Sequence, residues 1–212
     1  MATKRRGGLL LPLMIVVAAA AVFGSDEVID SVTGAFGGVI GRAETVGRDD
    51  GAFMVASSAK AEVDGCDKRE LTTLRKCKIP VLVIDAATMP HIARNIKLAW
   101  TNEGKPGVLH REEDPVKQKA NRNAACTRAA KAGLSSSCDE FPIVASKEGG
   151  AGARIEGVPM EEQCAQGWVV METARVNNMQ DSDPFVVIIV NPNKIATERY
   201  VGGMWLGSQR TC

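Results

Sequence analysis

Continuous apolar runs mark two strands of this chain that are expected to be covered on both faces. The first run extends from Ile79 to Asp85, and the second from Phe185 to Val190. Both are rich in β-branched residues and lack the alternation of a half-exposed strand, which is typical of strands inside a sheet. The pattern therefore predicts a core sheet built from segments far apart in the chain.

Helical spacing and capping residues predict three helices between these strands. In the first, Pro90 to Trp100, apolar side chains recur every three or four residues. The second begins at Asp114 and Pro115, because aspartate caps well and proline is tolerated in the first turn, and it is expected to reach Gly133. The third is predicted from Glu161 to Val176.

A hairpin is predicted between the second and third helices. The apolar segments Phe141 to Ala145 and Ala153 to Val158 are separated by a glycine-rich turn. Asp139 and Glu140 would then lie at the mouth of the first strand. The predicted order is β-α-α-β-β-α-β, an α/β (α+β) fold in which a small mixed sheet packs against helices.

The N-terminal pattern predicts export. A basic segment, Lys4 to Arg6, precedes an apolar run from Leu9 to Phe23, which is shorter than the roughly 20 residues needed to span a bilayer. Residues 1–24 are therefore predicted to be a signal peptide, with a retained anchor as the alternative. We expect residues 25–77 to be propeptide-like or loosely ordered, residues 78–212 to form the folded domain, and the product to be extracellular without stable membrane association.

Cysteine usage agrees with export. The six cysteines form an even set without the Cys-x-x-Cys spacing of zinc or redox sites, so disulfides are favoured. Proximity favours pairing Cys66 with Cys77 and Cys126 with Cys138. The two remaining candidates are Cys164 and Cys212.

Charge and residue types exclude several classes of function. The formal net charge is only +1, so no strong overall field attracts nucleic acid or anionic membrane, and any contact with a polyanion must be local. His91 and His110 lie outside the predicted hairpin, and Ser135 to Ser137 lack the strand-turn-helix context of a nucleophilic serine. A Ser-His-Asp hydrolase is therefore not supported.

Four short motifs follow one another in the second half of the chain. They are Asp139-Glu140-Phe141-Pro142, Glu148-Gly149-Gly150-Ala151-Gly152-Ala153, Gln166-Gly167 and Asp183-Pro184-Phe185. None is decisive alone, but the ordered set is specific. On these motifs and the preceding strand and helix, the chain resembles the NucA/NucB family of secreted bacterial and fungal deoxyribonucleases from about Ile79 to Val190.

The resemblance implies a metal-dependent, non-specific endodeoxyribonuclease of the ββα-metal type. It assigns Asp139 as the general base in the place where related nucleases use histidine, with Glu140 and Glu148 completing the catalytic set. A divalent ion, Mg²⁺ or Mn²⁺, would be held at the start of the third helix by Glu162 or Gln163. Many relatives carry asparagine at the place of Gln163, so Glu162 is the alternative ligand.

The resemblance also implies DNA as the substrate. The side chains expected to bind it are Arg122, Arg128, Arg154 and Gln166. One alternative is a secreted binding or structural module whose site has decayed, motivated by Gln163 and the near-neutral charge. Another is a DNase toxin, which predicts the same chemistry and an inhibitor protein as partner. No oligomeric state is predicted.

Overall fold

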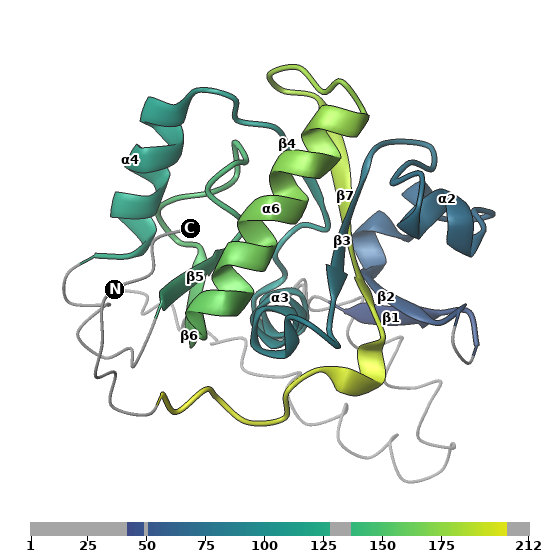
Figure 1. Ribbon diagram of the computed structural model, residues 1–212, viewed down its shortest axis with the longest axis horizontal. Helices are drawn as coiled ribbons and strands as arrows, with labels where there is room; N and C mark the ends of the chain where they lie inside the picture. The colour runs from purple at the N-terminus through teal and green to yellow at the C-terminus, as the bar shows by residue number, and fades with distance from the viewer. Residues whose placement is uncertain (1–41, 49–50, 128–136, 203–212) are drawn as a thin grey trace, which may run out of the picture. The chain divides into compact units, whose positions relative to one another are not determined.

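The computed structural model describes residues 42–48, 51–127 and 137–202 (Figure 1). The fold is mixed α/β, as predicted, with a five-stranded sheet, a two-stranded sheet and several packed helices. In the described ranges no helix is long and apolar enough to cross a membrane. The predicted signal peptide, residues 1–24, lies outside these ranges.

Strand β7 (Pro184–Val190) is the centre of the larger sheet. It runs parallel to β3 (Val81–Asp85) and antiparallel to β2 (Phe53–Ala56) and β4 (Val108–His110). The outer strand β1 (Ala43–Val46) pairs with β2. Four successive residues of β7, from 186 to 189, are fully buried, so the continuous apolar run reflects a strand covered on both faces, as predicted.

The described part of segment 25–77 is built into this sheet, where a loosely ordered arm was expected. Besides β1 and β2 it forms the turns of η3 (Ser57–Glu62) and the short helix α2 (Lys68–Thr72). All four residues of β2 are buried. Because cleavage at residue 77 would remove β2 from β7, we propose that the folded domain begins before β1. Four-residue strands are too short to show a clear hydrophobic period.

The three helices that spacing and capping residues predicted are present. Helix α3 (Pro90–Glu103) contacts both the main sheet and the hairpin, and α6 (Met160–Val176) packs on β3 and β5 (Figure 1). Helix α4 (Pro115–Ala125) has no buried residue and is capped by the Asp114 side chain. It ends earlier than the expected Gly133, and residues 128–136 lie outside the described ranges.

The hairpin consists of β5 (Ser137–Phe141) and β6 (Arg154–Val158). The prediction that its first strand spans Phe141 to Ala145 is wrong. Asp139 and Glu140 lie within the strand and not at its mouth. The apolar pattern failed because β5 is mainly polar and is buried by neighbouring elements, and because Pro142 cannot donate to a strand ladder.

Alternation along β5 sends its two acids to opposite faces of the hairpin. Asp139 meets α3, as does Phe141, whose ring contacts Trp100 edge to face with centroids 5.9 Å apart. Glu140 meets α4 instead, through Arg122. Neighbours in sequence therefore occupy different environments.

Two predicted disulfides are confirmed. Cys66 is bonded to Cys77, and Cys126 at the end of α4 is bonded to Cys138 on β5. Cys164 is also disulfide-bonded, while Cys212 lies outside the described residues. The bond between Cys126 and Cys138 holds α4 against the strand that carries both acids.

Candidate active site

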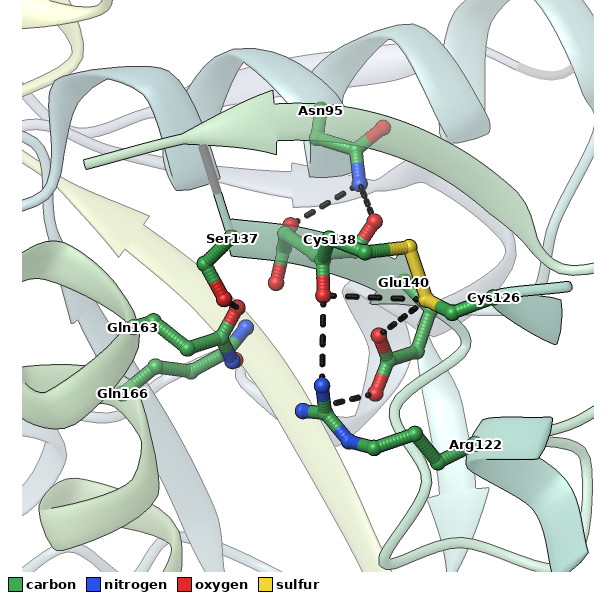
Figure 2. The surroundings of a disulfide bond; sticks show 9 residues. Asn95, Arg122, Cys126, Ser137, Cys138, Glu140, Gln163 and Gln166 are labelled. Atoms are coloured by element: carbon green, nitrogen blue, oxygen red, sulfur yellow. Dashed lines mark hydrogen bonds and ion pairs between the residues drawn. A yellow bond between two sulfur atoms is a disulfide. The ribbon is translucent and has the colours of Figure 1, made fainter. Parts of the chain in front are cut away.

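Asp139 is a fully buried carboxyl group that accepts a hydrogen bond from Asn95 and lies beside the Gln166 amide. Asn95 on α3 donates its Nδ2 to Asp139 Oδ2 at 2.8 Å, and the same nitrogen lies 3.4 Å from the Asp139 carbonyl oxygen. Asp139 Oδ1 has no hydrogen-bond partner among the described residues. Figure 2 shows Asn95 reaching down to β5. One carboxylate oxygen is thus fixed and the other is left to accept a proton.

Burial raises the pKa of Asp139 to about 8, because removal from water disfavours the charged form. The Asn95 amide opposes this increase by donating to the carboxylate, and the nearby negative charge of Glu140 adds to it. A carboxyl group with this pKa suits proton transfer near neutral or slightly alkaline pH. Perturbed groups of this kind concentrate at functional sites.

The first turns of α6 bring two glutamines to the same strand. Ser137 donates Oγ to Gln163 Oε1 at 3.3 Å, and Gln163 donates Nε2 to Gln166 Oε1 at 3.0 Å (Figure 2). The Gln166 side chain also lowers the pKa of Asp139, which places its amide beside the carboxyl group. Gln163 and Gln166 therefore join α6 to the Asp139 environment.

Glu140 is a second buried acid, on the other face of the hairpin. Arg122 Nη2 lies 3.3 Å from Glu140 Oε1, and its Nη1 donates to the Cys138 carbonyl at 3.5 Å. The guanidinium compensates a carboxylate that is only 3% exposed. Arg122 is thereby held beside the site by both an ion pair and the adjacent disulfide.

A cavity of about 680 Å³ opens beside this cluster. Its wall includes Glu140, Arg122, Gln163 and Gln166, together with apolar side chains such as Phe185. Asp139 is not part of the wall. The glutamine pair therefore lies at the boundary between the cavity and the buried carboxyl group.

The described residues contain one group of three potential metal-binding side chains, Cys126, Cys138 and Glu140. Its two sulfur atoms form a disulfide and carry no thiolate, so they do not bind a cation. A hard cation at this site would instead depend on carboxylate and amide oxygens and on water.

Glu162 contacts α3 and not Asp139. Its Oε2 accepts hydrogen bonds from the backbone N–H groups of His91 (2.9 Å) and Ile92 (3.0 Å), and its Oε1 lies 2.7 Å from His91 Nδ1. The carboxylate thus satisfies the N-terminus of α3, which has no side-chain cap of its own. These contacts support a structural role for Glu162.

Replacing Glu162 with glutamine is expected to lower the free energy of unfolding by about 1–3 kcal/mol, since it weakens charge-assisted hydrogen bonds in a buried position. Urea denaturation followed by circular dichroism measures this loss. The matched control is Glu161→Gln, because Glu161 is exposed in the same helical turn. Equal stabilities for the two variants would contradict the capping role.

The other predicted site residues that the structure describes contact different partners. Glu148 binds His110, accepting from its backbone N–H at 3.0 Å and lying 2.7 Å from its Nδ1. Arg154 pairs with Glu103 and Glu156. Arg128 lies outside the described residues. The cluster that the structure assembles is therefore Asp139, Glu140, Arg122, Gln163 and Gln166.

Asn95 is the contact that sequence reasoning missed. The signal was available, because Asn95 lies on the buried stripe of α3 between the apolar positions Ile92, Ile96 and Ala99. A polar side chain on such a stripe must meet a polar partner or lose hydration without compensation. The partner, Asp139, is evident only in the folded chain.

The fold and cluster define a hairpin-helix site, in which β5, β6 and the start of α6 gather carboxyl and amide groups beside a cavity. Residues 97–188 match the family model described as Deoxyribonuclease NucA/NucB, which confirms the resemblance over this segment. The match includes the whole hairpin and α6 but begins after Asn95. Comparison with curated proteins gave no match.

Proposed function

We propose that this protein is a secreted, metal-dependent endodeoxyribonuclease that hydrolyses DNA phosphodiester bonds with Asp139 as the general base. The observation that carries the proposal is the Asp139 carboxyl group, which has one oxygen fixed by Asn95 and the other without a hydrogen-bond partner among the described residues. It lies in the segment that matches the deoxyribonuclease family. The disulfides fit an oxidising, extracellular location.

In the proposed reaction, Asp139 Oδ1 accepts a proton from the water that attacks the phosphorus atom. Burial favours the protonated product of this step, since it raises the pKa of the carboxyl group to about 8. The substrate would reach Asp139 from the cavity by separating Gln163 from Gln166. Arg122, which lines that cavity, would stabilise negative charge on the phosphate.

The donor chemistry of the cluster fits a hard divalent cation such as Mg²⁺ or Mn²⁺. Gln163 is the better of the two ligands expected from the sequence, because among the described residues its Oε1 is engaged only by the long contact from Ser137, whereas Glu162 caps α3. When bound, the cation would lower the pKa of water and polarise the scissile phosphate. Asp139, oriented by Asn95, would remain the proton acceptor.

A second candidate function is a binding module on the same scaffold without catalysis. It is favoured by the complete burial of Asp139 and by the lack, in the ranges that the structure describes, of three convergent His, Asp or Glu side chains. This candidate predicts DNA retention without strand cleavage. The requirement of a divalent cation for strand cleavage distinguishes the enzyme from this module.

Chelation provides the direct test. We expect EDTA to reduce nicking of supercoiled plasmid at least ~100-fold, because both activation of water and neutralisation of the phosphate are lost. Excess Mg²⁺ or Mn²⁺ should restore cleavage, as measured by conversion of supercoiled to open-circular DNA on agarose gels. Absence of cleavage with Mg²⁺, Mn²⁺, Ca²⁺ and Ni²⁺ would favour the binding module.

A further inference from the structure

Asn95 occupies a position where the helix pattern calls for an apolar side chain. It is fully buried on α3, in the stripe that contains Ile92, Ile96 and Ala99. Asparagine is a weaker helix former than alanine or leucine, and burial removes its amide from water. Helix formation and core packing therefore do not explain the residue.

The contacts of Asn95 are concentrated on one residue. Its Nδ2 reaches both the side-chain Oδ2 and the backbone oxygen of Asp139, at 2.8 and 3.4 Å. Contact with two atoms of the same residue restricts rotation of the carboxyl group relative to β5. Asn95 Oδ1 and Asp139 Oδ1 are both without hydrogen-bond partners in the described structure. The interaction thus orients the carboxyl group and leaves one oxygen available.

The residue next to Asn95 on α3 provides a comparison, because it neutralises a buried acid with a positive charge. Arg94 forms an ion pair with Glu156, which lies opposite Asp139 in the hairpin register. Arg154 is the second cation near Glu156. Asp139, on the same face of the hairpin, instead accepts a hydrogen bond from the neutral amide of Asn95. A neutral donor fixes orientation while leaving the carboxyl group able to exchange a proton.

We propose that Asn95 is a positioning residue that acts through Asp139, holding Oδ2 so that Oδ1 faces the attacking water. The inference rests on the proposed function, in which Asp139 is the general base. It adds a residue that lies outside the segment matched by the deoxyribonuclease family. Asn95 itself does not line the cavity.

The test is Asn95→Leu, which keeps the branched shape of the side chain and removes the donor. We expect kcat for plasmid nicking to fall about 10–100-fold while KM for DNA changes less than about twofold, because only orientation of the base is lost. In the Asp139→Asn background, the same change should cause no further loss, since Asn95 acts through Asp139. Asn95→Ser, which leaves no large side chain to accommodate, should show the same loss of kcat.

Asn102→Leu on the same helix is the matched control, since Asn102 is exposed, and it should keep the wild-type kcat. Urea midpoints identify any variant that fails to fold. Cleavage by the wild type that is lost in Asp139→Asn but retained in both Asn95 variants would overturn the positioning role alone. An inactive wild type with every cation would overturn the proposed function and this inference together.

Discussion

Asp139→Asn is expected to reduce plasmid nicking at least ~1,000-fold at pH 8, because an amide cannot accept the proton of the attacking water. The substitution keeps the size of the side chain. The Asn95 amide can turn to present its Oδ1, which has no hydrogen-bond partner among the described residues, to the new NH₂ group. The variant should therefore fold, and the loss should appear in kcat.

Asp181→Asn is the control for removal of an acid. Asp181 is 49% exposed and pairs with Lys147, and it does not line the cavity beside Asp139. We expect its nicking rate to stay within about twofold of the wild type. If Asp139→Asn cleaved DNA at a comparable rate, Asp139 would not be the base, and Glu140 would be the next acid to replace.

The same substitution is expected to stabilise the fold at alkaline pH. The pKa of Asp139 is about 8 in the folded protein and near 3.8 in the absence of the fold. Between these values the folded state retains a proton that the unfolded state releases, so the wild-type free energy of unfolding should fall as pH rises from about 4 to 8. Asp139→Asn removes this dependence and should be more stable by at least about 2 kcal/mol at pH 9.

Urea denaturation across this pH range, in EDTA to exclude bound cations, measures the difference between the two proteins. Asp181→Asn should instead be less stable than the wild type by a similar amount across this range, because the hydrogen bond from Lys147 lowers the pKa of Asp181 to about 2. The stability that its charged form contributes is fully present above about pH 4 and is lost only as the pH falls toward 2. Parallel stability profiles for the wild type and Asp139→Asn would contradict a raised pKa. Greater stability combined with lost activity would identify a carboxyl group retained for function.

Sequence pattern predicted the elements whose burial is continuous or periodic. The runs that became β3 and β7, and the spacing in α3 and α6, report directly which faces lie in the core. The pattern failed for β5, where polar residues are buried because α3 and α4 supply partners from elsewhere in the chain. It also missed β2, which is too short to show a period but is buried against β7.

The candidate site was likewise predicted only in part from the sequence. Sequence motifs identified the segment from Asp139 to Gln166, and the family match confirms the resemblance there. They did not distinguish the roles of Glu162 and Gln163. Glu162 caps α3, whereas Gln163 faces Ser137 on β5. Adjacent residues on a helix point in different directions, and only packing decides which of them meets a given neighbour.

By itself, the sequence determined the mixed α/β class, two disulfide pairs and the deoxyribonuclease resemblance, because these depend on local pattern, proximity and ordered motifs. Only the tertiary structure decided that Asp139 is buried against Asn95 while Glu140 meets Arg122. The physical reason is that strand alternation sends adjacent side chains to opposite faces, and helices distant in sequence then give each carboxyl group its own surroundings.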